Sequence, residues 1–423
     1  MKYQAPTGTR DLFGEDLKYF QKIEKIAQEI LEFYGFGKIE TPVLEQSALF
    51  EKGTGESTDI VQKQMFCLQT KGGDSLTLRP EATPAIIRAY LEQGMESLPK
   101  PVKLWEFGPF FRYEKPQAGR YRQFYQISIE SLGSESWIID AQIIQIAYNI
   151  LKNLGLPNLI IKINSIGDSL CRPYYKKALI DHLKRSQNFL CPDCKKRFKT
   201  NPLRVLDCKK EGCRAKIREK APQILDHLCK ECHLHFKNVL EALDELELPY
   251  ILDPYLVRGL DYYTKTVFEI FQEQKEEESP LALASGGRYD GLVKTLGGKE
   301  TPGCGIALGV DRIANLLKKE VKKVFVSPKI FLIQIGDLAK RKALKLFEDF
   351  HKEKIKLTEA LHKDSLTLQL KIADKLKAKY VLILGQQEAS EEKIIIRDMK
   401  TGNQKTVPIS KAIKAMRKYS KKT

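Results

Sequence analysis

The segment LWEFGPFFRYEKPQAGRYRQFYQISIE at residues 104–130 constrains the fold more than any other part of the chain. Its two ends have the composition of β-strands, and a basic loop joins them. Arg112 ends the first strand, and Gln126 and Glu130 lie on the second. The segment therefore predicts an antiparallel pair that holds cations at one end and a carboxylate at the other. Such a pair suits a ligand with a polyphosphate at one end and an amine or other cationic group at the opposite end.

The length and charge of the chain limit its class. A chain of 423 residues predicts two or three domains, each large enough for its own core. No apolar run approaches the ~20 residues that cross a bilayer, and the N-terminus lacks the apolar segment of a signal peptide. We therefore expect a soluble cytoplasmic protein without a membrane partner. The formal net charge of +17 favours polyanions such as nucleic acid, but a lysine-rich surface without an RNA partner explains it equally well.

The order of predicted elements divides the chain into five segments. Strands separated by long loops and flanked by helices predict an α+β core with an antiparallel sheet, first in residues 1–184 and again in 249–317. Residues 185–248 are rich in cysteine, lysine and helix formers, which indicates an insertion. A linker at 318–327 precedes residues 328–423, whose alternation of buried strands and helices predicts a separate α/β domain.

Within these segments, patterns of apolar residues and of glycine predict the individual elements. Strands are expected at residues 39–44, 76–78, 102–112, 122–132, 160–163, 257–270, 281–285, 330–335, 380–384 and 393–397. Helices are expected at residues 17–34, 84–93, 138–154, 338–355, 366–376 and 409–419, together with a glycine-rich turn that leads into a helix over 303–317. The polar patch at 274–279 predicts a hairpin tip.

Further motifs follow one another in a particular order. They are TLRPEAT at 77–83, the basic loop after Arg112, RGLDYY at 258–263, GGRYDG at 286–291 and GCGIALGVDR at 303–312. Together with FGKIETPVLE at 36–45, they resemble histidyl-tRNA synthetase, a class II aminoacyl-tRNA synthetase, over nearly the whole chain. The motifs at 258–263 and 286–291 separate this family from other class II synthetases.

The resemblance implies an activity and partners. The enzyme would activate L-histidine with ATP and Mg²⁺ to histidyl-adenylate, and would then transfer histidine to the 3′ end of tRNA(His). It would be a homodimer, with residues 36–45 at the interface. The last domain resembles the anticodon-binding domain of these enzymes, and its basic residues would contact the RNA backbone.

The resemblance also assigns residues to ATP. Adenylate formation requires a carboxylate to attack the α-phosphorus of ATP, so positioning and placed cations dominate the catalysis. Arg112 would bridge the α-phosphate and the incoming carboxylate, with Arg258 as the second catalytic cation on the other side. The remaining contacts with ATP would come from Glu114, Arg120, Phe124 and Arg312. Taken alone, each of these arginines is more often a surface salt bridge than a functional residue.

The histidine pocket is implied in the same way. Glu81, Thr83 and Gln126 would bind the α-ammonium group, next to Ala82, while Arg112 and Arg258 would lie at the carboxylate of histidine. Glu130 and Tyr263 would bind the imidazole, and Tyr262 would line the pocket. The alternation of Gln126, Ser128 and Glu130 with apolar residues also fits an exposed amphipathic strand. Tyr262, Tyr263 and Tyr289 could instead be core residues; of the three, Tyr263 is the first functional candidate and Tyr289 the last.

Six of the nine cysteines lie between residues 191 and 232. The two CxxC pairs Cys191/Cys194 and Cys229/Cys232 predict a structural Cys₄ zinc site that takes no part in catalysis. Cys213, His233 and His235 are alternative ligands. Cys208 is disfavoured because NPLRVLDC resembles a stretch in family members that we expect to lack zinc. The other interpretation is a set of buried thiols without a metal.

Two other functions fit part of the sequence. A non-catalytic relative of the synthetase that binds histidine and regulates its biosynthesis would keep the core fold, but it would lose motif residues and the last domain. The motif arginines and the last domain weigh against it. A plain RNA-binding protein would explain the charge but not the histidine-pocket residues.

Overall fold

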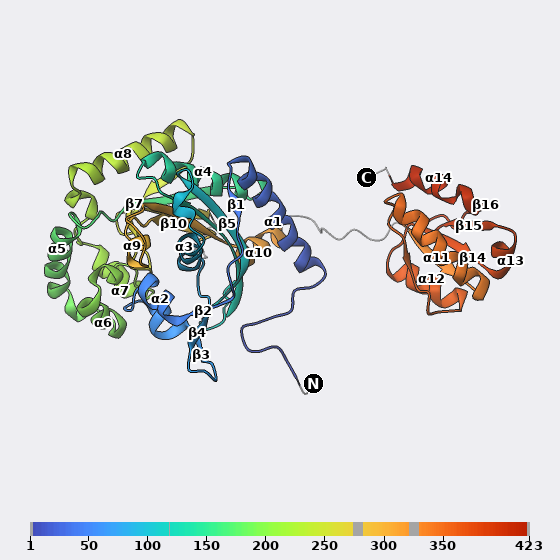
Figure 1. The fold of residues 1–423 in the computed structure, drawn as a ribbon, viewed down its shortest axis with the longest axis horizontal. Coiled ribbons are helices and arrows are strands. Elements are labelled where there is room, and N and C mark those ends of the chain that lie inside the picture. The colour runs from blue at the N-terminus through green and yellow to red at the C-terminus, as the bar shows by residue number, and fades with distance from the viewer. Residues whose placement is uncertain (1–2, 118, 274–281, 321–329, 421–423) are drawn as a thin grey trace. The chain divides into compact units, whose positions relative to one another are not determined.

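The computed structural model describes residues 3–117, 119–273, 282–320 and 330–420. They belong to two compact units, Met1–Val324 and Phe325–Thr423 (Figure 1). The predicted hairpin tip at 274–279 and most of the predicted linker at 318–327 lie outside the described residues. Among the helices that are described, none is both long enough and apolar enough to span a membrane.

An eight-stranded sheet forms the centre of the first unit. Its order is β1 (Gly37–Lys38), β5 (Val102–Phe111), β6 (Gln123–Leu132), β11 (Gly303–Gly309), β10 (Ala284–Arg288), β9 (Thr264–Gln272), β7 (Leu159–Ser165) and β8 (Tyr250–Leu252). The outermost pairs, β1–β5 and β7–β8, are parallel, and the pairs between them are antiparallel. The predicted antiparallel core is therefore confirmed, and β5 and β6 form the expected pair.

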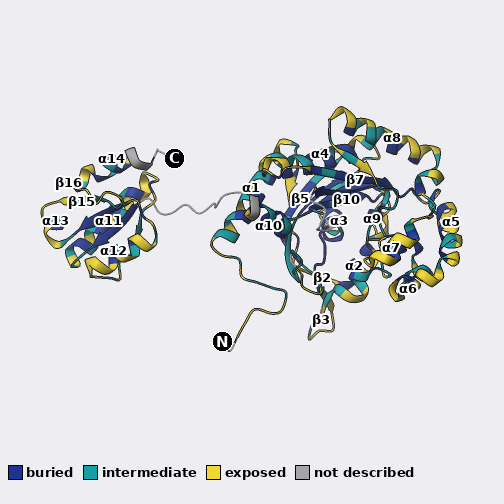
Figure 2. Ribbon diagram, turned by 180° about the vertical axis from the view of Figure 1, so that it is seen from behind, coloured by how far each residue is buried: buried dark blue, intermediate teal, exposed yellow. Residues whose placement is uncertain are grey.

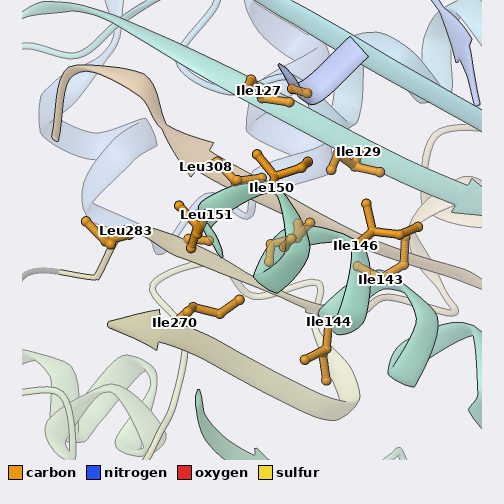
Figure 3. Close-up of a cluster of buried hydrophobic side chains, with 14 of the residues drawn as sticks. Ile127, Ile129, Ile143, Ile144, Ile146, Ile150, Leu151, Ile270, Leu283 and Leu308 are labelled. Atoms are coloured by element: carbon orange, nitrogen blue, oxygen red, sulfur yellow. The ribbon is translucent and has the colours of Figure 1, made fainter. Parts of the chain in front are cut away.

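One face of this sheet packs against long helices. The helices are α1 (Glu15–Phe33), α4 (Trp137–Asn153), α8 (Lys230–Glu245) and α10 (Val310–Glu320). Ile127 and Ile129 of β6 meet Ile143 and Ile150 of α4 in the main apolar core (Figure 3). These four side chains are at most 1% exposed, and burying each contributes about 1.5–3 kcal/mol. This packing fixes which face of β6 remains available for polar residues.

The opposite face carries a smaller layer. The three-stranded sheet β2 (Leu44–Gln46), β4 (Ser75–Leu78) and β3 (Phe66–Gln69) lies with helices α2 (Ser47–Thr54) and α3 (Thr83–Glu92). Residues of α3 share a second apolar cluster with β5 and with Val267 of β9. The short helix α9 (Leu292–Thr295) follows β10 and joins the same cluster.

The cysteine-rich segment is helical and has its own small core. Helices α5 (Arg172–Arg185), α6 (Pro192–Thr200) and α7 (Glu211–Arg218) pack around Leu179, Leu183, Val205 and Ile217, with Cys194, Cys208 and Cys213 in the same cluster. Much of the outer surface of α5 and α6 is exposed, whereas the central strands of the large sheet are buried (Figure 2).

The second unit has the predicted α/β alternation. Its sheet order is β13 (Thr358–Glu359), β12 (Ile330–Gln334), β14 (Tyr380–Leu384), β15 (Lys393–Asp398) and β16 (Gln404–Pro408). Helices α11 (Asp337–Lys352), α12 (Leu366–Lys375), α13 (Gln386–Ser390) and α14 (Ile409–Ser420) complete it. Strand β16 was not expected, because its residues are mostly exposed and carry little apolar signal.

Three sequence expectations about elements of the first unit are wrong. The strand expected at 39–44 is irregular over residues 39–43, between β1 and β2. Residues 303–309 form the central strand β11 and not a glycine-rich turn, and α10 begins only at Val310. Glycine is needed at positions 303 and 305, where a β-carbon would collide with the ring of Tyr289 and with Glu130. The strand predicted at 257–270 begins at Thr264, so the RGLDYY motif lies in the loop before β9.

Candidate active site

A pocket lies on the face of the large sheet opposite α4. Ile127 and Ile129 point into the core, so the alternating Gln126, Ser128 and Glu130 point the other way and line the pocket. Ser128 and Glu130 are each 2% exposed, which excludes the alternative of an exposed amphipathic strand. The Oγ of Ser128 is buried without a hydrogen-bond partner among the described residues, so a polar group in the pocket is free to bind it.

One end of the pocket contains two buried carboxylates. Thr54 donates a hydrogen bond to Glu81 Oε1 at 2.5 Å, and the hydroxyl of Tyr262 donates to Oε2 at 2.8 Å. Burial raises the pKa of Glu81, although these hydrogen bonds and the charges of Arg112 and Arg258 oppose the rise. This carboxylate can accept an ammonium group in a site that is largely closed to solvent.

The second carboxylate is Glu130. Thr83, the first residue of α3, donates to its Oε1 at 2.7 Å, and the hydroxyl of Tyr289 donates to its Oε2. Burial raises the pKa of Glu130 to about 7, even though both hydrogen bonds favour the charged form. The negative charge of Glu81 contributes to this rise. A cationic ligand between the two carboxylates would therefore reduce the electrostatic repulsion between them.

The other end of the pocket is cationic. Arg112, at the end of β5, donates from Nε to the carbonyl of Pro80 at 2.8 Å and lies over the ring of Phe124, with its Cζ 5.4 Å from the centroid. Burial lowers the pKa of Arg312, and the charges of Arg120 and Arg112 lower it further. The guanidinium groups of Arg112, Arg120 and Arg312 are therefore close enough to repel one another. Such a cluster of cations is expected where a polyanion binds.

The loop between β5 and β6 contributes an ion pair to this end. Arg120 Nη1 lies 3.8 Å from a carboxylate oxygen of Glu114. Both side chains are partly exposed, at 31% and 23%, so the pair is weak and can open for a ligand.

Arg258, on the loop before β9, is held by an ion pair with Glu269 of that strand. Its Cζ lies 5.6 Å from the centroid of the Tyr263 ring. Its Nε is buried and, within the described part of the chain, has no hydrogen-bond partner. The guanidinium is therefore fixed in place and still has one donor available.

The structure brings all the predicted histidine- and ATP-binding residues to this one pocket. The lining includes Glu81, Ala82, Thr83, Arg112, Glu114, Arg120, Phe124, Gln126, Glu130, Arg258, Tyr262, Tyr263 and Arg312. The interpretation of the arginines as surface salt bridges is wrong for Arg112, Arg258 and Arg312, because all three line the pocket and Arg258 is only 15% exposed.

Tyr289, the last of the three tyrosines as a functional candidate from the sequence, is the one whose hydroxyl donates to Glu130. The hydroxyl of Tyr262 binds Glu81, while Tyr263 contacts Arg258. The insertion also reaches the pocket, with Arg197, Arg204, Asp207 and Lys209 in its lining. No local pattern signalled that contact, because it depends on how the insertion packs against the core.

The predicted set of four zinc ligands does not assemble. Cys191 and Cys194 group with Cys208 and Cys213, whereas Cys229 and Cys232 group with Asp168 and Cys171. The two CxxC pairs begin different helices, α6 and α8, and these helices pack in different clusters. His235 is not a free ligand either, because its Nε2 lies 2.8 Å from Asp140 Oδ2.

Comparison with known proteins agrees with this architecture. The family model for histidyl-tRNA synthetase matches residues 8–313, and a model for an anticodon-binding domain matches residues 329–419. The histidine–tRNA ligase of Caldicellulosiruptor saccharolyticus is 42% identical over 411 residues, which cover 97% of each chain. That of Thermosipho melanesiensis is 43% identical over 404 residues, which cover 95% of each.

Solved structures give the same result. The apo histidyl-tRNA synthetase of S. aureus superposes with a TM-score of 0.81 at 34% identity, covering 98% of this chain and 99% of that one. An antiparallel core with a bipolar pocket, followed by an anticodon-binding domain, defines an aminoacyl-tRNA synthetase of class II. Within that class, the chain belongs to the histidyl-tRNA synthetase family.

Proposed function

We propose that the protein is a histidine–tRNA ligase, which forms histidyl-adenylate from L-histidine and ATP and then charges tRNA(His). The main support is the bipolar pocket, in which three guanidinium groups converge at one end and two buried carboxylates lie at the other. A zwitterionic amino acid with a basic side chain and a nucleoside triphosphate match these two ends.

In the first step, a carboxylate oxygen of histidine attacks the α-phosphorus of ATP. A new O–P bond forms, the bond to the β-phosphate oxygen breaks, and pyrophosphate leaves. Arg112 and Arg258 are the proposed catalytic cations on either side of the phosphate and the carboxylate. The attacking group is already ionised, so no general base is required, and fixed cations supply most of the stabilisation.

Histidine recognition is assigned to the carboxylate end. Glu81, Thr83 and Gln126 would bind the α-ammonium group, next to Ala82, while Glu130 and Tyr263 would bind the imidazole beside Tyr262. Tyr289 would orient Glu130, because its hydroxyl donates to that carboxylate. An apolar side chain of similar size would leave these buried polar groups unpaired, which penalises the wrong amino acid.

ATP is proposed to enter as its magnesium complex, because Mg²⁺ binds phosphate oxygens and keeps several water ligands. Arg120 and Arg312 would contact its outer phosphates, Phe124 would stack on adenine, and Glu114 would accept from the exocyclic amine. The stacking of Arg112 over Phe124 means that adenine must share this ring or shift the guanidinium.

In the second step, a hydroxyl of the terminal ribose attacks the carbonyl carbon of the adenylate. The ester bond to histidine forms, and AMP leaves. The second unit would bind the anticodon stem, and its lysines would meet the phosphate backbone. We propose a cytoplasmic homodimer that joins through residues 36–45, where Val43 and Leu44 are 38% and 45% exposed in the single chain.

The deciding experiment is histidine-dependent ATP–pyrophosphate exchange by the purified full chain, compared with Arg258→Ala. We expect exchange that requires histidine, ignores other amino acids and falls by at least about 100-fold in the variant, the order expected for loss of an electrostatic contact in the transition state. Arg185→Ala, at an exposed position at the end of α5, is the matched control and should keep the wild-type rate.

A second outcome would favour the regulatory interpretation. A folded protein that binds histidine but shows no exchange would contradict the ligase proposal. An ATP phosphoribosyltransferase regulatory subunit/histidyl-tRNA synthetase from Bacillus halodurans shares this fold, with a TM-score of 0.66 at 19% identity. Fold alone therefore does not exclude that class, and the exchange assay does.

A further inference from the structure

The cysteine-rich segment forms a cluster of four sulfur atoms. The Sγ atoms of Cys191, Cys194, Cys208 and Cys213 all lie within 4.8 Å of one another. Cys194, Cys208 and Cys213 are at most 6% exposed, and Cys191 is half-buried. All four are free thiols. The cluster therefore brings four soft ligands together with little access for bulk water.

The geometry of this cluster matches a tetrahedral metal site. Four sulfurs about 2.3 Å from one ion at tetrahedral angles lie about 3.8 Å apart, and the Sγ atoms of Cys191 and Cys208 are 3.7 Å apart. The backbone N–H of Cys191 donates to the Sγ of Cys213 at 3.3 Å, a hydrogen bond that stabilises a thiolate. Cys191 occupies the N-cap position of α6, and Cys213 lies in the first turn of α7. Two helix N-termini therefore favour negative charge at this point.

Basic residues near the cluster can compensate its negative charge when the four cysteines are thiolates. Four thiolates and one divalent ion carry a net charge of −2. Arg197 interacts electrostatically with Cys194, and Lys195, Lys196, Lys209 and Lys210 lie next to the cysteines in the chain. Thiolates in a closed tetrahedral set prefer Zn²⁺ over the hard cations.

We propose that Cys191, Cys194, Cys208 and Cys213 bind one structural Zn²⁺ ion, which holds residues 201–209 against the active-site pocket. The spacing of two residues, then thirteen, then four between successive ligands closes a compact loop around the ion. This assignment replaces the pairing of the two CxxC motifs, which the fold separates.

The loop closed by the cluster touches the catalytic core at two points. Arg197 and Arg204 each bind Asp59 Oδ2 at 2.8 Å. Asn201 donates to Asp261 Oδ1 at 2.8 Å, and Asp261 belongs to the same loop as Arg258. Removing the ion would free this loop and loosen both contacts, so the metal would act on the pocket by positioning and not by contact with substrate.

The second group, Asp168 with Cys171, Cys229 and Cys232, provides an internal comparison. It offers one oxygen and three sulfurs. An ion there would have one Zn–O bond of about 2.0–2.2 Å, whereas an ion in the Cys₄ cluster would have four Zn–S bonds of about 2.3 Å. X-ray absorption therefore distinguishes the two locations without a mutation.

The test begins with the metal content of the full chain, purified without chelator, incubated with Zn²⁺ and freed of excess ion by gel filtration. We expect the double variant Cys208→Ser/Cys213→Ser to lose one equivalent of zinc relative to wild type. Cys67→Ser, which removes an exposed thiol outside the cluster, should lose none. We also expect trypsin to cleave near Lys209 and Lys210 at least about ten times faster in the double variant, because the closed loop is released.

Some results would overturn the proposal. Unchanged zinc content in the double variant, or iron in place of zinc, would do so. If the double variant does not fold, the wild-type protein still decides the matter. An X-ray absorption spectrum that requires four sulfur ligands supports the Cys₄ site, and one with three sulfurs and an oxygen at a single equivalent refutes it. None of these measurements depends on aminoacylation, so their failure is distinct from failure of the ligase proposal.

Discussion

Gly305 of β11 lies directly beside Glu130 of β6, so that a β-carbon at position 305 would come within 1.8 Å of Glu130 Oε2. The same β-carbon would also come within 2.7 Å of the backbone oxygen of Ile129. On the next strand, a β-carbon at Gly286 would meet the carbonyl oxygen of Gly305 at 2.2 Å. Glycine is required at position 305 because the buried carboxylate of Glu130 occupies the space that a side chain would fill, and at position 286 because the backbone of β11 occupies it.

Gly305→Ala tests this requirement directly. We expect the variant to lose about 1–3 kcal/mol of folding stability and to bind histidine at least about tenfold more weakly, because Glu130 must leave its position. Urea unfolding and isothermal titration with histidine measure the two effects. Gly72→Ala, in the turn between β3 and β4, meets only ordinary contacts of 3.7 Å and should change neither. Unaltered histidine affinity in Gly305→Ala would show that the position of Glu130 is not critical.

The raised pKa of Glu130 should make the folding stability of the ligand-free protein depend on pH. Burial raises its pKa to about 7 from an ordinary value of 4.5, so the folded protein holds a proton that the unfolded chain releases. This contribution to stability is fully present below about pH 4.5 and is lost as the pH rises through about 7, with an upper limit of about 3 kcal/mol.

We therefore expect the ligand-free wild type to lose stability relative to Glu130→Gln between about pH 5 and about pH 8. Chemical unfolding at a series of pH values measures the difference. Glu56→Gln, at an exposed position, should track the wild type throughout. A constant difference between wild type and Glu130→Gln across this range would contradict the raised pKa.

Arg312 provides a test of the cationic end of the pocket. Its Nη1 donates to the carbonyl of Ala282 at 2.6 Å, which fixes the guanidinium near Arg112 and Arg120. We expect Arg312→Ala to raise the KM for ATP by about 10- to 100-fold, the value of a hydrogen bond to a charged group, with a smaller change in the KM for histidine. Steady-state pyrophosphate exchange separates the two constants. Equal changes in both would indicate a general loss of structure.

Arg288 of the GGRYDG motif should behave differently. Its side chain is fully buried, binds Asp140 Oδ1 at 2.5 Å and donates to the carbonyls of Ser134 and Ser136 at 2.8 and 3.1 Å. Burial would raise the pKa of Asp140, but the hydrogen bond from His235 and the charge of Arg288 outweigh it and lower the pKa. Arg288 therefore stabilises the fold and does not bind substrate.

We expect Arg288→Met to cost about 3–5 kcal/mol of stability, because it leaves a buried carboxylate without its cation. The KM values for ATP and histidine of the molecules that remain folded should stay close to wild type. Denaturant unfolding together with exchange assays at low temperature gives both quantities. The exposed Arg185→Met is the control for loss of a guanidinium alone. A stable variant with a raised KM would place Arg288 in the substrate site instead.

Much of the fold follows from local patterns. The apolar spacing at 17–34 and 138–154 predicted α1 and α4, and the strand signals at 102–112 and 122–132 predicted β5 and β6 within one or two residues. These elements are long and strongly patterned, so local sequence decides them. Strand β11 was missed as a strand because its glycines, taken locally, indicate a turn.

Some residues of the candidate site could also be predicted from the sequence, and others could not. The motif residues Arg112, Arg258 and Glu130 were found because their order along the chain resembles a family. The pairing of Tyr289 with Glu130 was missed, since a tyrosine between an arginine and an aspartate gives no sign of its partner 159 positions away. The approach of Arg204 and Asp207 to the pocket was missed for the same reason.

The sequence by itself determined the order of helices and strands, the polar face of β6 and the identity of the charged residues. These depend on periodicity and residue type, which act over a few positions. Only the tertiary structure decided that Cys208 and Cys213 complete the cluster of Cys191, and that Gly305 makes room for Glu130. Two CxxC pairs look the same along the chain, and the packing of the helices that carry them determines which sulfurs come together.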